Sequence, residues 1–268
     1  MAVNPRHTEI LTSARNPLLR DVRRALDRGE LTSEGFCVAE TFHLLEEAIR
    51  SDVQVKAVLA ATSVRSAVER HVRGLRNFPV TVVRDDIFHE ISSTESSQGV
   101  ITLAKPPAWQ LDQLFRGRTL LVVLDGIQDP GNAGTILRTA EAFGATGVLF
   151  IKGSVSPYNP KVLRASAGSV FRLPLVAAMD PLLAQAALEQ HRLDIYAASS
   201  SAKASLTETN LTRRIAIIMG SEAHGVSERM RGIARELRIP TSGVESLNAA
   251  MAAGILLYEA SRQRRLKK

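Results

Sequence analysis

The chain has 268 residues, of which 45% are apolar and 23% charged, a composition typical of a folded globular protein and not of a disordered one. Its single cysteine, Cys37, excludes an internal disulfide and a cysteine-clustered zinc site, and its six histidines lack the spacing of metal ligands, so we expect no metal. No apolar run approaches the ~18 residues of a membrane span and the first residues lack a signal-peptide core, so we expect a cytoplasmic protein without a membrane partner.

The formal net charge is +7, which suggests a polyanionic partner. The first 105 residues hold 14 basic and 14 acidic side chains, so the whole excess lies in residues 106–268. Part of this excess is the tail at 262–268. Two interpretations of the tail stand: a solvated helix end, where cations suit the helix dipole, and a contact with nucleic acid.

The first third of the chain alternates between strand-like and helix-like segments. We expect helices at 16–28, 41–50 and 63–74, and strands at 36–40, 53–60, 78–83 and 99–104. These segments predict a compact α/β domain over residues 1–105. Residues 106–118 contain two consecutive prolines, which resist both helix and strand pairing, so we predict a linker there.

The rest of the chain predicts a second α/β domain over residues 119–268. Near-continuous apolar runs predict strands at 119–125, 147–151, 171–176, 193–199, 215–219 and 236–240. Helices are expected at 132–144, 159–167 and 181–191, then as a short basic helix and a long one at 245–265. Buried strands separated by helices indicate a mainly parallel sheet covered on both faces. In such sheets ligands bind beyond the carboxyl ends of the strands.

The first loop at such an end, DGIQDPGNAGTILR (125–138), resembles a nucleotide-binding turn but lacks its spacing. Gly131 and Gly134 form GxxG, where a dinucleotide fingerprint needs GxGxxG, and the next strand ends in Lys152 where that fold needs an acid. No phosphate-binding GxxxxGK[ST] loop occurs. What remains is Asn132 at an expected helix N-cap and Arg138 further along the helix. Taken alone, this loop is better explained as a capped helix with a surface arginine.

Two later loops hold polar side chains among small residues. GSEAHGVS (220–227) places Glu222 in a turn between two glycines, which let a ligand or another backbone approach closely. IPTSGVESLNAAMAAG (239–254) places Ser246 and Asn248 at the start of a helix rich in small residues. The alternative for this loop is an N-cap followed by tight packing against a neighbouring element.

In this order and spacing, NAGTILR, GSEAHGV and IPTSGVESLN closely resemble the three motifs of the SpoU (TrmH-type) RNA 2′-O-ribose methyltransferases of the SPOUT superfamily. Residues 119–265 resemble the catalytic domain. Residues 1–105, with NPLL near the start and TESSQGVITLAK at the end, resemble a ribosomal-protein-like domain that recruits the substrate. The resemblance implies an α/β sheet with a trefoil knot, S-adenosylmethionine as cofactor, a homodimer, and structured RNA as substrate, ribosomal in preference to transfer RNA.

The resemblance also assigns roles to residues. Arg138 would engage the RNA and help to activate the attacking hydroxyl across the dimer interface, and Asn132 would orient it. The catalytic set would be completed by Glu222, Ser246 and Asn248. The cofactor would lie against Ser199, Gly220, Ile239 and Leu247. Because a guanidinium stays protonated, we expect Arg138 to hold a phosphate and stabilise the developing alkoxide instead of acting as a base.

Two other functions remain open at the level of sequence. The first is a non-catalytic RNA-binding or ribosome-assembly protein that keeps the fold, which a failure to bind S-adenosylmethionine would favour. The second is a dehydrogenase with a Rossmann loop, which the GxxG spacing and Lys152 argue against.

Overall fold

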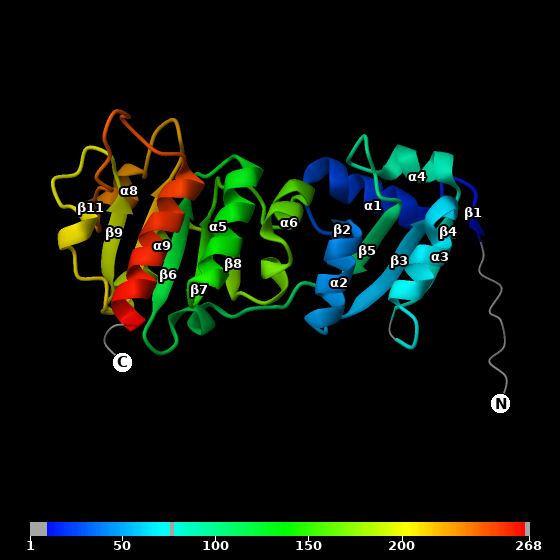
Figure 1. The fold of residues 1–268 in the computed structure, drawn as a ribbon, viewed down its shortest axis with the longest axis horizontal. Coiled ribbons are helices and arrows are strands. Elements are labelled where there is room, and N and C mark those ends of the chain that lie inside the picture. Colours follow the sequence, from blue (N-terminus) through cyan, green and yellow to red (C-terminus); the bar gives the residue numbers. More distant parts are fainter. Residues whose placement is uncertain (1–9, 76–77, 266–268) are drawn as a thin grey trace. The chain divides into compact units, whose positions relative to one another are not determined.

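The computed structural model describes residues 10–75 and 78–265, which form two compact units (Figure 1). The first unit contains the chain up to Pro107 together with Tyr158–Phe171. The second contains Ala108–Pro157 and the chain from Arg172 onward. The last residues of the basic tail, 266–268, lie outside the described residues. Within the described part, no helix is both long and apolar enough to cross a membrane.

The first unit is built on a five-stranded mixed sheet of order β1-β4-β3-β5-β2. Its strands are β1 (Ile10–Leu11), β2 (Cys37–Glu40), β3 (Val55–Ala61), β4 (Val80–Val83) and β5 (Val100–Ala104). Its helices are α1 (Pro17–Arg28), α2 (Phe42–Arg50), α3 (Arg65–His71), α4 (Asp85–Ile91) and α6 (Pro160–Ser166). Asn16 caps α1 by accepting a hydrogen bond from the Leu18 amide at 2.9 Å, and Pro17 supplies a preset first residue.

The domain boundaries in the structure differ from the expected ones at helix α6. This helix packs in the first unit, although in the chain it lies between two strands of the second unit. Arg164 on α6 donates from Nη1 to Glu40 Oε2 at 2.8 Å, and the Glu40 side chain is only 5% exposed. The Ser93 amide also donates to this carboxylate, at 2.8 Å. A buried carboxylate without such partners is strongly destabilising. Pairing with Glu40 therefore ties this segment to the first unit.

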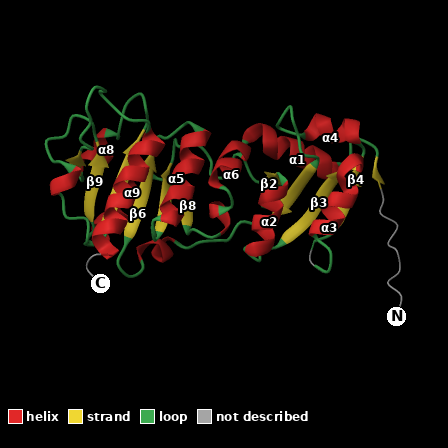
Figure 2. Cartoon of the chain, in the orientation of Figure 1, coloured by secondary structure: helices red, strands yellow, loops and turns green. Residues whose placement is uncertain are grey.

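The second unit is built on a six-stranded sheet of order β11-β9-β10-β6-β7-β8 in which every pairing is parallel, as the apolar runs predict. Figure 2 shows the strands and the helices around them. The strands are β6 (Leu120–Asp125), β7 (Gly147–Ile151), β8 (Leu175–Met179), β9 (Asp194–Ala198), β10 (Ile215–Gly220) and β11 (Arg235–Leu237). The helices are α5 (Pro130–Ala142), α7 (Pro181–Gln190), α8 (Glu228–Gly232) and α9 (Ala249–Arg265).

Both faces of the central strands are covered by helices. One face packs on α7 and α8, through Leu188 and Met230 among others. The opposite face is covered by α5 and α9, which lie side by side in Figure 1 and contact each other along their length. Gly254 of α9 faces Thr139 of α5, and a Cβ at this position would be in ordinary van der Waals contact with Thr139 Cγ2, at 3.7 Å. Because both faces are covered, β6 is buried throughout, and the exposed chemistry is confined to the ends of the strands.

Three expected segments differ from the structure. The strand expected at 171–176 is β8, which begins only after Pro174, because proline cannot donate to a strand ladder. The linker expected at 106–118 is partly folded: a 3₁₀-helix at Leu111–Phe115 buries Leu114 in the second unit. The long helix begins at Ala249 and not at 245, so the residues before it form a loop.

Candidate active site

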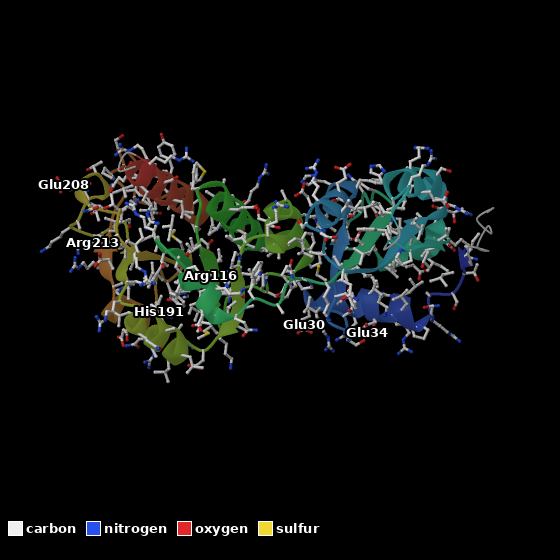
Figure 3. The ribbon with its side chains drawn as sticks, turned by 90° about the horizontal axis from the view of Figure 1, so that it is seen from below. Glu30, Glu34, Arg116, His191, Glu208 and Arg213 are labelled. Atoms are coloured by element: carbon white, nitrogen blue, oxygen red, sulfur yellow. The ribbon has the colours of Figure 1, made fainter. Side chains whose placement is uncertain are left out.

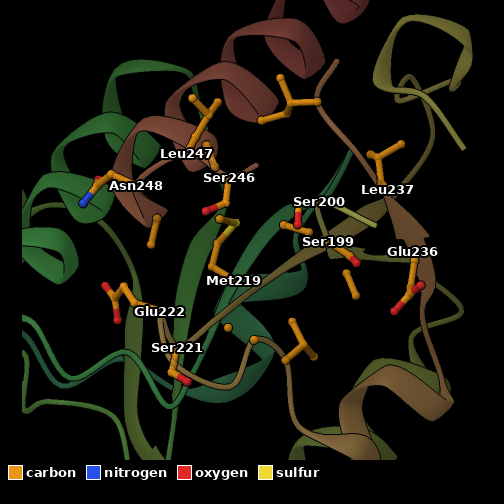
Figure 4. Close-up of a pocket in the computed structure, with 18 of the residues that line it drawn as sticks. Ser199, Ser200, Met219, Ser221, Glu222, Glu236, Leu237, Ser246, Leu247 and Asn248 are labelled. Atoms are coloured by element: carbon orange, nitrogen blue, oxygen red, sulfur yellow. The ribbon is translucent and has the colours of Figure 1, made fainter. Parts of the chain in front are cut away.

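A cavity of about 470 Å³ opens at the carboxyl ends of β9, β10 and β11 in the second unit. Its walls come from the loops that follow these strands and from the loop that leads into α9 (Figure 4). Seven of the nine residues selected from the sequence line it: Ser199, Gly220, Glu222, Ile239, Ser246, Leu247 and Asn248. The other two, Asn132 and Arg138, lie on α5.

The loop after β10 folds back on itself through two backbone hydrogen bonds between Ser221 and Gly225, at 2.8 and 3.0 Å. Gly220 makes this turn possible, since a Cβ at this position would lie 2.0 Å from the Gly225 carbonyl carbon. Asp125, a buried residue at the end of β6, accepts a hydrogen bond from the Ser227 amide at 2.7 Å and fixes the far side of the loop. The turn therefore holds Glu222 at the rim of the cavity, as the bracketing glycines predict.

The start of α5 corrects one prediction, because Asn132 is not the N-cap. The cap is Asp129, whose carboxylate accepts a hydrogen bond from the Asn132 amide at 2.6 Å, and Pro130 begins the helix. An acidic cap followed by proline is a strong start signal, and it moves the helix start ahead of Asn132. The Asn132 side chain is consequently free to make contacts outside its own helix.

A chain of hydrogen bonds joins the three loops. Asn248 donates from Nδ2 to Asn132 Oδ1 at 2.9 Å, and Asn132 donates from its own Nδ2 to Glu222 Oε1. Asn248 Oδ1 meanwhile accepts from the amides of Ala250 and Met251, at 2.9 and 3.3 Å, which is the geometry of an N-cap. Asn248 thus fixes the start of α9 and the orientation of the Asn132 amide, and that amide holds the Glu222 carboxylate.

Arg138 is exposed on α5 and makes no hydrogen bond or ion pair with any described residue. It lies six residues beyond Asn132, which places it about 120° around the helix from the side that meets α9. Its guanidinium is therefore not part of the hydrogen-bonded chain described above. It is available to a ligand or to another molecule.

The cavity also contains residues that the sequence does not single out. Arg231 and Glu236 form an ion pair at 3.4 Å (Nε to Oε1), and Arg231 donates from Nη2 to the Val226 carbonyl at 3.1 Å. Ser200 and Met219 are further lining residues. For Ser200 and Met219 the available signal was their position near the ends of β9 and β10. Arg231 lies on α8 and Glu236 in β11, and no spacing in the sequence connects them.

These surroundings fit a nucleoside-containing sulfonium cofactor. Apolar side chains of Met219, Leu237, Ile239 and Leu247 offer a surface for a flat base, while serine hydroxyls and the Glu236 carboxylate offer partners for polar groups. The turn at Gly220, which a single Cβ would fill, supplies exposed backbone close to the cavity. Among the described residues, no group of histidine, cysteine and acidic side chains could hold a metal ion.

Comparisons with known proteins agree with this geometry. Residues 119–258 match the model of the SpoU rRNA methylase family, and residues 16–102 match an MRM3-like substrate binding domain. An uncharacterised tRNA/rRNA methyltransferase of Synechocystis is 32% identical over 94% of this chain and 93% of its own. The 23S rRNA (guanosine(2553)-2′-O)-methyltransferase of Bacillus subtilis is 30% identical over 92% and 97%. The crystal structure of the methyltransferase AviRb from Streptomyces viridochromogenes with S-adenosylmethionine superimposes with a TM-score of 0.85 at 27% identity, over 94% of this chain and 99% of that one.

Proposed function

The chain belongs to the SpoU rRNA methylase family, and we propose a division of labour among its residues for the reaction of that family. The protein transfers a methyl group from S-adenosylmethionine to a ribose 2′-hydroxyl of RNA. When bound, the cofactor supplies an electrophilic methyl group on a sulfonium. The protein has to align the acceptor oxygen with that methyl group and help the hydroxyl to lose its proton.

In this proposal the cofactor is held by four residues: Ser199, Gly220, Ile239 and Leu247. They surround the cavity from three loops, and the turn at Gly220 leaves no room for a side chain. The hydrogen-bonded chain from Asn248 through Asn132 to Glu222 is the observation that supports the proposal most strongly. It joins all three motifs at one edge of the cavity. Ser246, next to this chain, completes the polar rim.

Arg138 acts on the RNA. A guanidinium is a poor base, but its fork of donors matches a phosphate. A fixed positive charge near the acceptor also stabilises the negative charge that develops on the ribose oxygen. Arg138 is exposed and has no partner among the described residues, as expected of a side chain that binds an anionic ligand.

The working form is a homodimer in which Arg138 serves the cavity of the partner. The exposed sides of α5 and α9 adjoin along the seam between the two helices and form one face, which combines small residues and large apolar ones. On α5 these exposed residues are Gly131, Thr135, Arg138 and Ala142, and on α9 they are Met251, Ile255 and Tyr258. Met251 is 62% exposed and Tyr258 55%, which is unusual for large apolar side chains in a monomer. A twofold-related copy would cover this face on both subunits at once.

Mixing two inactive variants tests the shared site. Arg138→Ala removes the cation, and Gly220→Ala blocks the cavity of its own subunit. If Arg138 serves the partner's cavity, a refolded mixture contains heterodimers with one intact site, and about a quarter of wild-type activity returns on statistical mixing. If Arg138 serves its own cavity, each subunit of the heterodimer has a defect in its own site, and the mixture stays inactive. A covalently linked dimer with both substitutions in one half distinguishes these cases, because only the cross-subunit arrangement leaves it inactive.

We propose ribosomal RNA as the substrate and the cytoplasm as the place of action. The B. subtilis relative is named for a 23S rRNA nucleotide, and the first unit matches a substrate binding domain. The buried thiol of Cys37 is compatible with a reducing compartment. Mapping of 2′-O-methyl groups in total RNA, from strains with and without the gene, should show one site that disappears. An unchanged set of sites would contradict the proposal.

A further inference from the structure

The opposite end of the catalytic sheet, where the strands begin, gathers arginines from distant parts of the sequence. Strands β9, β10 and β6 are neighbours, and Ile215 of β10 pairs with both Asp194 of β9 and Leu120 of β6. Two residues before this row, the chain carries an arginine on each of the three segments: Arg192, Arg213 and Arg118. Parallel strands lie about 4.8 Å apart, so their starting residues share one edge.

Three arginines at this edge are held by backbone carbonyls. Arg264, near the end of α9, donates to the carbonyls of Leu211, Arg118, Thr119 and Arg213 at 2.6–3.0 Å. Arg118 donates from Nε to the Thr212 carbonyl at 2.6 Å, and Arg214 donates to the Phe115 carbonyl at 3.0 Å. Carbonyl oxygens satisfy the donors without neutralising the charge. Burial, followed by the nearby Arg118 charge, lowers the pKa of Arg264 to about 10, which still leaves it protonated at neutral pH.

Three further arginines at the same edge point outward. Arg116 and Arg192 are exposed and form no ion pair with any described residue. Arg213 is 75% exposed and forms a long ion pair with Asp194, at 3.9 Å from Nη1 to Oδ2. Figure 3 is seen from below relative to Figure 1 and labels Arg116, His191 and Arg213 of this unit. Two further acidic residues lie near this edge: Asp112, which is 93% exposed and 3.8 Å from His191, and Glu189, whose backbone carbonyl accepts a hydrogen bond from the Arg192 amide at 3.0 Å. Six arginines therefore gather at this edge of the sheet.

We propose that Arg116, Arg192 and Arg213, called here the amino-edge cluster, bind phosphates of the RNA at a second place, remote from the methylated ribose. This inference rests on the proposed function, because it takes RNA as the substrate. Guanidinium groups grip phosphate oxygens in pairs, and the carbonyl-bound arginines behind them add to the positive potential without competing for the ligand. RNA is favoured over an acidic protein because the reaction already brings RNA to this unit.

The position of the cluster constrains the substrate. The six residues of β6 separate the cluster from the cavity by about 20 Å. An RNA that touches both places must therefore extend well beyond the loop that presents the acceptor ribose. The cluster thus selects for a folded RNA with a second helical arm or flanking segment, and it adds affinity without contributing to the chemical step.

A charge-removal variant tests the proposal in the full-length protein. Arg116→Gln, Arg192→Gln and Arg213→Gln are combined, and a matched Arg→Lys triple variant keeps the charge. Binding to deproteinised ribosomal RNA from a strain lacking the gene is measured by filter retention over 50–300 mM salt. We expect the glutamine variant to bind about tenfold more weakly at the lower salt concentrations, with a log–log salt slope reduced in magnitude by about 2 to 3. The lysine variant should stay close to wild type.

Calorimetric titration with S-adenosylmethionine should give the same affinity for all three proteins, which shows that the cavity is intact. If the glutamine variant keeps both the RNA affinity and the salt slope of the wild type, the cluster does not bind RNA. If it keeps its RNA affinity but loses affinity for polyglutamate, the cluster is a docking site for an acidic protein and the proposal is likewise overturned. Absence of RNA binding by the wild-type protein would instead count against the proposed function.

Discussion

The two ends of the catalytic sheet share the strands β9 and β10, yet their chemistry is opposite. At the carboxyl end, glycines, serines and amide side chains surround a cavity, and Glu222 is held by an amide. At the amino end, arginines bond to backbone carbonyls and further arginines face outward. Helix α9 connects both ends, since Asn248 fixes its first turn and Arg264 fixes its last. Because parallel strands all begin at one edge and end at the other, the cavity and the arginine cluster lie at opposite ends of the sheet.

Substituting Gly220 should have the largest effect, since it removes the cavity that distinguishes the carboxyl end. In Gly220→Ala the new Cβ would lie 2.0 Å from a backbone carbon of Gly225, which cannot move without opening the turn. We expect the affinity for S-adenosylmethionine to fall at least about 100-fold by calorimetry, since both the fit and the backbone donors are disturbed. Gly232→Ala is the matched control, because nothing lies within 4 Å of its Cβ. Equal affinities for the two variants would disprove this role of the turn.

Arg138→Ala should separate catalysis from cofactor binding at the same end of the sheet. We expect methyl transfer to fall by about 10³-fold or more, because the cation near the developing oxyanion is lost. The affinity for S-adenosylmethionine should stay within about twofold of wild type, since Arg138 does not line the cavity. A calorimetric titration in which cofactor binding disappears would refute this division between RNA and cofactor.

The amide chain gives a subtler test. Asn132→Asp keeps the shape of the side chain but replaces the donor toward Glu222 with a second carboxylate, so the two groups repel each other. We expect kcat to fall about 100-fold, as for other small displacements of a positioning group, with a much smaller change in cofactor affinity. Asn210→Asp should behave as wild type in the same assay, because Asn210 Oδ1 accepts two hydrogen bonds from Thr212 and an aspartate oxygen can accept them equally. Full activity in Asn132→Asp would show that the donor is dispensable.

The smallest expected effect belongs to the amino end and concerns stability. Arg264→Met removes four hydrogen bonds that join α9 to the segments before β6 and β10. Since water can replace some of these donors, we expect a loss of about 1–3 kcal/mol and a melting temperature lower by a few degrees. Arg265→Met, at the exposed end of the same helix, should melt within about one degree of wild type. If the two variants melt at the same temperature, the four hydrogen bonds of Arg264 contribute nothing to stability.

The sequence predicts the parallel sheet and the loops of the cavity because both follow from local patterns. Buried apolar runs such as Ile215–Gly220 identify strands, and parallel strands place their following loops at one edge. The helix starts were harder. Asn132 resembles a cap as much as Asp129 does, and only the structure shows which amide is bonded.

Features that depend on strand order could not be predicted from the sequence. Arg118, Arg192 and Arg213 are up to 95 positions apart in the sequence, and their common edge follows only from the pairing of Ile215 with Leu120 and Asp194. The same holds for α6, which packs in the first unit through Glu40 and Arg164, although its place in the chain is inside the catalytic domain.

The most direct test of the central claim locates the transferred methyl group. Ribosomal RNA from a strain lacking the gene is incubated with the protein and methyl-tritiated S-adenosylmethionine, then hydrolysed in alkali. A 2′-O-methyl group blocks attack on the adjacent phosphate, so the label should appear in alkali-stable dinucleotides, with none from Arg138→Ala. Label in mononucleotides that carry a methylated base, or equal label from Arg138→Ala, would contradict the account.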